Sequence, residues 1–521
     1  MDTAYANERE PQPFESSLEK FEEMTSFLGS SESLSKQHHE LEVYVEEHGR
    51  EMLRRMMQGH LDVRAAAERR TEVRGSDEVE RCRVREETYR PLRLIFGDVQ
   101  VKRLLYQADG VEGLAPMDAS LNLPTEMFSF GIRGLVAREV ACNSYEHAVR
   151  QLERYCAKGT GKRQVEELAM RAAEDFDAFY EEGMQCRVDV SGDDLLVLTF
   201  DGAAIRVLVD DLREATRKKR LEDDDEPQRW PAPKGATRRA AKRRAMIAGV
   251  YDVSPFPRTA EDIVRDLQRL RDATKPQRPN PVNKRIWASV VQDCEGIVEE
   301  GFAEALKRDP KRQRTWVILV DGDEHQLDCI RRCAEHYGVA AVILLDVIHV
   351  LGYLWDAAYC FHERGSDEAE AWVMDRLVML LTGTDPSQVA AGMRRSATRQ
   401  GLVDRADLDK CATYLINHRD IMNYEAALGT GMPIATGVIE GAARYVVRDR
   451  MDKTGARWST DGAEAVLRLR ALEASHDFDA YWSFHVAKEY SVNHASRYAD
   501  GAPPLPIPTA PSRPKLRLLK S

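Results

Sequence analysis

The chain has 521 residues, of which 43% are hydrophobic and 31% are charged. This composition is typical of a globular protein, and the length predicts several domains. The formal net charge of −12 argues mildly against a nucleic-acid partner, although a net charge hides local basic clusters. No apolar run is long enough and free enough of charge to span a membrane, since the nearest, 339–355, contains Asp346 and His349.

Nine cysteines are spread along the chain without a CxxC pair. Cys329 and Cys333 stand four residues apart, which is helical spacing for two core-facing residues. With no zinc pattern and no secretory leader, reduced thiols in a cytoplasmic protein are expected.

The N-terminal part is predicted to be disordered at first and then mainly helical. Residues 1–33 are polar and aperiodic, whereas helical periodicity begins at Leu34 and predicts a mainly helical region over 34–185. Within it, 90–106 alternates around a Gly-Asp turn and predicts a β-hairpin. The hairpin carries four basic residues, Arg90, Arg93, Lys102 and Arg103.

Residues 144–182 predict two helices joined by a glycine-containing turn, with Ser144 as a cap. The pair resembles a helix-turn-helix, with Arg163 early in its second helix. DNA binding and plain helix packing are equally favoured here. The GTGK sequence in the turn is not a P-loop, because Cys156 stands where the first glycine is needed and Arg163 where Ser or Thr is needed.

The middle of the chain predicts an α/β sheet. Apolar runs of strand character occur at 195–211, 242–253, 315–324 and 339–350. Such runs, joined by helical segments, are typical of parallel strands covered on both faces. Residues 260–309 are predicted to be mostly helical. The basic stretches 217–220 and 238–244 favour a solvated loop, with a phosphate-contacting loop as the alternative.

Three predicted strands end in an aspartate: Asp201, Asp321 and Asp346. In parallel sheets, ligands bind beyond the carboxyl ends of strands, and adjacent strands lie about 4.8 Å apart. Carboxylates there suit metal ions about 3.5–4 Å apart, and Mg²⁺ prefers such hard ligands. Each aspartate alone is more often a turn former or a helix cap.

Two further pairings involve charged residues on helices. Glu440 is followed at i+4 and i+8 by Arg444 and Arg448, a pattern that by itself favours an ion pair on a helix surface. His349 follows Asp346 at DxxH spacing, which favours a buried polar pair at a helix start over a supporting role or a DNA contact.

Residues 431–472, GMPIATGVIEGAARYVVRDRMDKTGARWSTDGAEAVLRLRAL, resemble the C-terminal signature of insertion-sequence transposases of the ISKra class. The matching pieces are the PI…G.IE lead-in, the R..V..R helix, the G.RWS turn and the GAEA.L.LR helix. Other segments match the family in the same order, at 96–106, 116–124, 198–205, 211–220, 242–259, 317–324 and 344–355.

The resemblance implies a ribonuclease-H-like catalytic domain, made of 190–350 and 431–500 and interrupted by an all-α insertion at 351–430. The region 34–185 would bind the transposon ends, and 501–521 would form a Pro-rich basic tail. The expected partners are double-stranded DNA, as transposon ends and target, and further copies of the chain. A bacterial cytoplasmic protein that acts at the nucleoid, without a membrane, is expected.

The resemblance also implies a DDE triad of Asp201, Asp321 and Glu440 that binds two Mg²⁺ or Mn²⁺ ions. Asp201 would lie between the ions, with the other two on either side. Asp346 is expected outside the triad, because its strand lies one place further from that of Asp201, and with His349 it would support the site. The candidate DNA contacts are Arg90, Arg93, Lys102, Arg103, Arg163, Arg444 and Arg448.

Two alternative functions stay open. One is a ribonuclease-H-like nuclease or resolvase without strand transfer, and the other is a domesticated DNA-binding protein without catalysis. The three intact carboxylates favour an enzyme, and the long N-terminal half favours recognition of transposon ends.

Overall fold

The computed structural model describes residues 12–156, 159–183, 185, 187–214, 216–218, 242–268, 277–452 and 456–507. The chain divides into two compact units, unit 1 of Met1–Met184 with Asp479–Ser521, and unit 2 of Gln185–Phe478. The predicted catalytic segment 431–500 therefore extends too far, because its last part belongs to unit 1. In the described residues, no helix is both long and apolar enough to cross a bilayer.

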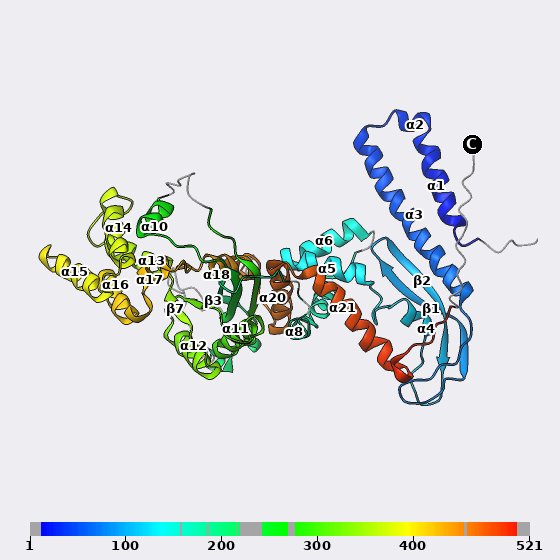
Figure 1. Ribbon diagram of the computed structural model, residues 1–521. Coiled ribbons are helices and arrows are strands. Elements are labelled where there is room, and N and C mark those ends of the chain that lie inside the picture. Colours follow the sequence, from blue (N-terminus) through cyan, green and yellow to red (C-terminus); the bar gives the residue numbers. More distant parts are fainter. Residues whose placement is uncertain are drawn as a thin grey trace, which may run out of the picture. The chain divides into compact units, whose positions relative to one another are not determined.

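Unit 1 begins with two long helices, α1 Glu15–Leu28 and α3 His38–Ala67, joined by the short helix α2 Ser31–Leu34 (Figure 1). The prediction of disorder over 1–33 is wrong for its described part. The reason is that α1 is amphipathic and packs on α3, which buries Met24.

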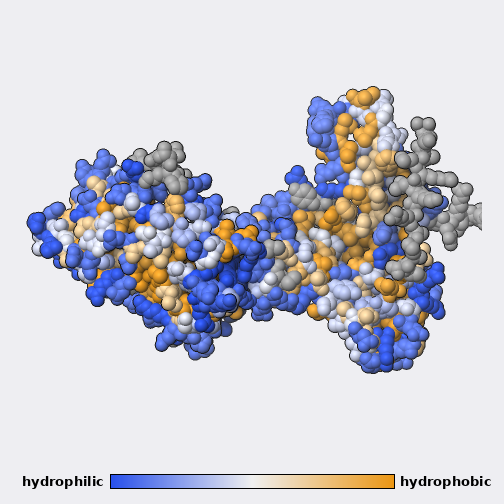
Figure 2. Space-filling model, in the orientation of Figure 1, coloured by the Kyte–Doolittle hydropathy of each residue, from blue (hydrophilic) through white to orange (hydrophobic). Residues whose placement is uncertain are grey.

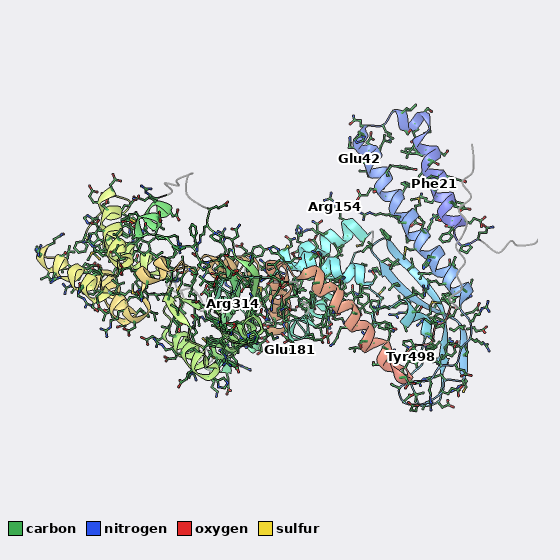
Figure 3. All side chains as sticks on the ribbon, in the orientation of Figure 1. Phe21, Glu42, Arg154, Glu181, Arg314 and Tyr498 are labelled. Atoms are coloured by element: carbon green, nitrogen blue, oxygen red, sulfur yellow. The ribbon has the colours of Figure 1, made fainter. Side chains whose placement is uncertain are left out.

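The predicted β-hairpin is present and consists of β1 Arg83–Leu94 and β2 Gly97–Gln107. Its turn is at 95–96 and not at Gly97-Asp98 as predicted, because Gly97 and Asp98 pair with Leu94 and Arg93. Behind it, Tyr498 (labelled in Figure 3) is buried together with Tyr106 of β2 in a small apolar cluster. The C-terminal part of the chain thus completes the core of the N-terminal unit.

The other helices of unit 1 are α4 Pro116–Ser120, α5 Phe130–Cys142, α6 Tyr145–Cys156, α7 Lys162–Ala172, α8 Phe176–Glu181 and α21 Phe478–Asn493. The predicted helical pair over 144–182 corresponds to α6 and α7, and α8 follows as a separate helix. Helix α21 joins this group, since the Tyr481 hydroxyl donates to the Ala172 carbonyl at 2.6 Å.

Unit 2 is built on a five-stranded mixed sheet of order β5-β4-β3-β6-β7 (Figure 1). Its strands are β3 Leu195–Arg206, β4 Lys242–Val253, β5 Val282–Ser289, β6 Trp316–Val320 and β7 Val342–Leu345. β3, β6 and β7 are parallel, and β4 is antiparallel to both of its neighbours. The α/β prediction is confirmed at this level.

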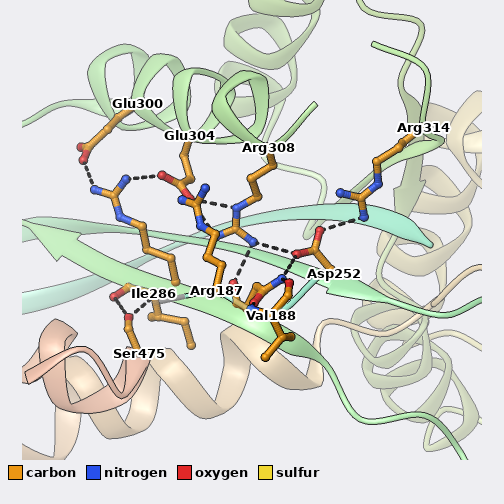
Figure 4. Close-up of polar contacts among 11 residues, drawn as sticks. Arg187, Val188, Asp252, Ile286, Glu300, Glu304, Arg308, Arg314 and Ser475 are labelled. Carbon is orange, nitrogen blue, oxygen red and sulfur yellow. Dashed lines mark hydrogen bonds and ion pairs between the residues drawn. The ribbon is translucent and has the colours of Figure 1, made fainter. Parts of the chain in front are cut away.

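Helices cover both faces of this sheet. α11 Cys294–Arg308 packs on β3 and β4, and α20 Thr460–Ser475 packs on β5 from the other face (Figure 4). The prediction of a mostly helical 260–309 is wrong for β5. This strand pairs with β4 at the edge of the sheet, and its apolar half is buried between β4 and α20.

Helices dominate the rest of unit 2. They are α10 Ala260–Leu267, α12 Glu324–Tyr337, α13 Val347–Ala358, α14 Asp367–Leu381, α15 Pro386–Arg399, α16 Ala406–Asn417, α17 Tyr424–Gly429, α18 Gly437–Ala442 and α19 Asp449–Met451. Between α18 and α19 lies a π-helix, η3 Ala443–Arg448. The segment between β7 and α18 is helical, as its sequence predicts.

Candidate active site

Three aspartates lie at matching register positions on the parallel strands of unit 2. The last paired residues are Thr199 with Leu319, and Val320 with Leu345. If the pairing of β3 with β6 and of β6 with β7 is continued past these residues, Asp201 aligns with Asp321, and Asp321 aligns with Asp346. Adjacent strands lie about 4.8 Å apart, so Asp201 and Asp321 are neighbours and Asp346 lies one strand further out. The expected order of these three strands is confirmed.

β3 does not end at Asp201, which corrects the sequence prediction. The strand continues to Arg206 because β4 pairs with it along its whole length. Only the parallel pairing with β6 stops before this level. Next to Asp201, Gly202 lets the Arg244 side chain of β4 lie against the β3 backbone, since a Cβ there would be 2.1 Å from Nε of Arg244.

Asp201 shares a sheet face with Thr199, because side chains alternate along a strand. A Cβ at Gly249 of β4 would touch both Thr199 and Ile439, so this face is the one that α18 covers. The helix of Glu440 therefore packs on the sheet face that Asp201 shares.

Asp201 is a half-buried carboxylate without a cationic partner. Its Oδ1 accepts a hydrogen bond from the Gly202 N–H at 2.6 Å, and no Lys, Arg or His nitrogen in the described part of the chain lies within 4.0 Å of it. Burial raises the pKa of Asp201, and Asp321 raises it further, whereas the Gly202 N–H, Arg448 and His349 lower it. Two neighbouring carboxylates in such surroundings favour binding of a cation.

Asp321 opens the loop between β6 and α12. Its Oδ1 accepts a hydrogen bond from the Asp323 N–H at 3.0 Å. The next residue, Gly322, has φ of +92°, and a Cβ there would lie 2.9 Å from Nε2 of His418, so both conformation and space require glycine.

Two residues near the end of the helical segment hold this loop in place. The Tyr414 hydroxyl donates to the Asp321 carbonyl at 2.8 Å, and Nε2 of His418 lies 2.9 Å from the Gly322 carbonyl. Sequence reasoning missed both residues, because they lie 93 and 96 positions from their partners and belong to no local motif.

The Asp346–His349 pair is formed as the DxxH spacing predicts. Nδ1 of His349 lies 3.1 Å from Oδ2 of Asp346, and the Thr436 hydroxyl also donates to this buried carboxylate. The hydrogen bond with Asp346 raises the pKa of His349, burial opposes this, and the charges of Asp321 and Asp201 add to the rise. His349 is therefore close enough to both strand aspartates to interact with their charges.

Glu440, the third predicted carboxylate, stands apart from the other two. It is exposed on α18. In the described part of the chain, the only group of three or more Asp, Glu, His and Cys ligand atoms within 4.8 Å of one another lies elsewhere. The structure thus brings Asp201 and Asp321 together beneath the helix of Glu440, but it does not bring the three carboxylates to one point.

Glu440, Arg444 and Arg448 are predicted to lie roughly on one face, and all three are exposed. α18 passes directly into the π-helix η3, which has more residues per turn than an α-helix. A step of four residues there comes close to a full turn, so Arg444 and Arg448 stay roughly on the side of Glu440.

Both arginines are exposed, as Glu440 is. Arg444 pairs with Asp449, five residues further on, at 3.8 Å. The charge of Arg448 lowers the pKa of Asp201, so this guanidinium is close enough to interact with that carboxylate.

The three hairpin arginines that are candidate DNA contacts are held by carboxylates of unit 1. Arg90 and Arg103 both pair with Asp118, at 3.1 and 2.7 Å, and Arg93 pairs with Asp98 at 2.8 Å. Each leaves 12–16% of its side chain exposed. These contacts give the three arginines a structural role, which makes them weaker candidates for DNA contacts.

Lys102 and Arg163 are the accessible candidates of unit 1. Their side chains are 44% and 91% exposed, and among the described residues they form ion pairs only with the exposed Glu87 and Glu167. The basic loop of unit 2 is described only at 217–218 and from 242 onward, and the rest of it lies outside the described residues.

Asp201 and Asp321 fit a hard divalent cation. They supply carboxylate oxygens from adjacent strands, both are half-buried, and the charge of Asp321 raises the pKa of Asp201. Comparison with known protein families and with curated proteins gave no match.

Proposed function

We propose that the chain is a DNA transposase whose unit 2 is a ribonuclease-H-like catalytic domain. The observation that carries this proposal is the neighbouring, register-matched position of Asp201 and Asp321 on two adjacent parallel strands. The strand order agrees with the order that the resemblance to ISKra-class transposases implies for Asp201, Asp321 and Asp346.

Asp201 and Asp321 would bind Mg²⁺ or Mn²⁺ through their carboxylate oxygens. Two bound ions supply activation of the attacking hydroxyl and stabilisation of the leaving oxygen of a phosphodiester. Tyr414 and His418 fix the Asp321 loop, and Asp346 orients His349 beside the two carboxylates. Arg448 adds a positive charge close to Asp201, where a DNA phosphate would be attracted.

Glu440 is proposed as the third ligand, delivered by a change in its helix. The adjoining π-helix η3 is a form that is frequent at functional sites. Its conversion to an α-helix would shift the phase of the helix by about one residue and turn Glu440 relative to Arg448.

The proposed partners are double-stranded DNA and further copies of the chain, in a bacterial cytoplasm. Self-association is supported by an apolar surface, since hydrophobic residues, coloured orange in Figure 2, gather on the α1–α3 helix pair. The exposed apolar side chains of this pair are Leu18, Phe21, Leu28, Val43, Val45, Leu53, Met56, Met57 and Val63. A patch of this kind marks protein–protein contact sites.

The test uses the purified full-length chain and duplexes carrying the terminal repeats that flank its gene, with scrambled-end duplexes as control. In Mg²⁺ we expect end-specific cleavage and joining of the freed 3′ end to target DNA, and binding without cleavage in Ca²⁺. Cleavage without joining would favour the nuclease, and binding without cleavage the domesticated DNA-binding protein. Undiminished cleavage in EDTA would contradict the mechanism.

A further inference from the structure

Two thiols and an imidazole converge between the starts of α11 and α12. The Sγ atoms of Cys294 and Cys329 and one ring nitrogen of His325 all lie within 4.8 Å of one another. Cys294 is the first residue of α11, whereas His325 and Cys329 stand four apart on one face of α12. In the described part of the chain this is the only group of three such ligands at this spacing.

The donor set defines the ion that it would take. Thiolate sulfur and imidazole nitrogen are the ligands of zinc, and they differ in kind from the carboxylates that suit Mg²⁺. Tetrahedral zinc, with Zn–S about 2.3 Å and Zn–N about 2.0 Å, places its ligand atoms about 3.5–3.8 Å apart. Small side-chain rotations would bring the present cluster to that geometry.

We propose that Cys294, His325 and Cys329 form a Zn²⁺ site, with a water molecule as the fourth ligand. Both thiols are buried whereas His325 is exposed, so the open side of the cluster faces solvent. Asp323, the nearby carboxylate, is already engaged as the N-cap of α12 and by Arg244 at 3.2 Å, which leaves the fourth position to water.

Binding would be coupled to proton release. A cysteine binds Zn²⁺ as a thiolate, so each of the two thiols gives up its proton when it becomes a ligand. When Zn²⁺ binds, two S–H protons pass to the solvent and two Zn–S bonds and one Zn–N bond form, while the ion loses water ligands. Affinity should therefore increase steeply with pH.

The zinc site would have a structural consequence beside the candidate active site. It would tie the first residue of α11 to the first turns of α12, which begins three residues after Asp321. This inference does not rest on the proposed function, because it concerns a different set of ligands and a different ion.

The experiment measures metal content and Co²⁺ spectra of the full-length chain purified under reducing conditions. We expect about one Zn²⁺ per chain, and on replacement by Co²⁺ the thiolate-to-cobalt absorption of a tetrahedral site. His325→Ala, at an exposed position, should weaken Zn²⁺ binding by at least about tenfold without loss of helical circular dichroism. Cys329→Ser should abolish the thiolate spectrum.

Two control variants are matched to these changes. Cys333→Ser lies on the same helix outside the cluster, and His336→Ala is a second α12 histidine, so both should retain the metal and its spectrum. Absence of Zn²⁺ binding after reconstitution would overturn the proposal. Retention of the full spectrum by both His325→Ala and Cys329→Ser would overturn it as well. Neither result bears on DNA cleavage, which the Asp201 and Asp321 variants test.

Discussion

The two ends of the unit 2 sheet carry buried carboxylates in opposite electrostatic surroundings. At the end where β3 begins, Asp252 and Glu304 are enclosed by arginines (Figure 4). At the end where the parallel strands finish, Asp201 and Asp321 lie side by side, and no basic nitrogen of a described residue is within 4.0 Å of either.

At the arginine-rich end every charge is compensated. Glu304 pairs with Arg187, with Arg285 at 2.7 Å and with Arg308 at 2.8 Å. Burial alone would raise the pKa of Glu304, but the three guanidiniums outweigh it and the pKa is lowered. Asp252 is equally buried and accepts from Arg314 at 2.8 Å.

The contrast separates two uses of a buried carboxylate. A carboxylate that is fully paired with arginine is part of the fold, and its ionised form is already stabilised. A half-buried carboxylate that faces another carboxylate lacks that compensation, so a bound cation would supply it. Changes at Asp201 and Asp321 are therefore expected to affect mainly catalysis, whereas changes at Glu304 are expected to affect mainly stability.

The largest effect is expected from removing the unpaired carboxylates. Asp201→Asn and Asp321→Asn should each reduce cleavage by at least about 10³-fold, the equivalent of about 4 kcal/mol of lost transition-state stabilisation. Both variants should still bind end DNA in a mobility-shift assay, and Glu440→Gln should behave likewise. A fully active Asp321→Asn enzyme beside an inactive Asp346→Asn enzyme would reverse the assignment.

The next effect concerns stability at the arginine-rich end. Glu304→Gln should destabilise unit 2 by about 3–5 kcal/mol, because three guanidiniums would lose their buried counter-charge. Urea unfolding followed by the fluorescence of Trp287 and Trp316 measures this. Glu300→Gln is the matched control and should cost about 1 kcal/mol or less, because the more exposed Glu300 carboxylate pairs with one arginine, Arg285, among the described residues. Equal losses in both variants would argue against a distinct buried network.

Divalent cations should act on one end of the sheet alone. At about 100 times the dissociation constant, Mn²⁺ should stabilise the wild type by about 2.7 kcal/mol, a rise in melting temperature of roughly 5–10 °C. Glu304→Gln should melt lower but keep this rise, whereas Asp201→Asn should lose it. A rise that survives Asp201→Asn would place the cation elsewhere.

A smaller effect on cleavage is expected from Asp346, whose strand lies one place further from that of Asp201. Asp346→Asn should reduce cleavage by about tenfold without abolishing it, because it acts only through the orientation and charge of His349. The same change should lower the pKa of His349, since its hydrogen bond with Asp346 is the main cause of the raised value. Titration by NMR measures this pKa, and an unchanged value would contradict the supporting role.

The sequence predicts the site best where local pattern and sheet geometry coincide. Apolar runs locate β4, β6 and β7, and the strand-end position of Asp321 follows from them. β5 was missed because only half of it is apolar and it lies at an edge inside a stretch with helical character. The α1 helix was missed because its apolar face is short and pairs with a helix rather than with a large core.

Contacts between residues far apart in the sequence could not be predicted from local sequence patterns. No spacing rule links Tyr414 to Asp321, or Cys294 to Cys329, because each pair meets only when separate elements of the fold pack together. The π-helix η3, which directly follows the helix of Glu440, has no recognisable signal in its sequence. These contacts do not test whether Asp201, Asp321 and Glu440 act together, which stays a prediction.

The smallest expected effect is on the pH dependence of stability, and its sign is opposite at the two ends of the sheet. The pKa of Asp201 is raised in the folded chain, so its contribution to stability is fully present below the unfolded pKa and is lost as pH rises through the folded value. Without divalent ions, Asp201→Asn should therefore be more stable than the wild type near neutral pH, and this advantage should vanish on acidification.

Glu304 should show the reverse dependence. Its pKa is lowered, so its stabilising contribution is present above the unfolded pKa and is lost as pH falls through the folded value. The deficit of Glu304→Gln should shrink on acidification, as the wild type loses the same interaction. Urea unfolding of the three proteins in EDTA, from about pH 4 to about pH 8, measures both slopes. If Asp201→Asn were less stable than the wild type by a margin that grows with pH, Asp201 would have to be paired like Glu304, and the distinction between the two ends would fail.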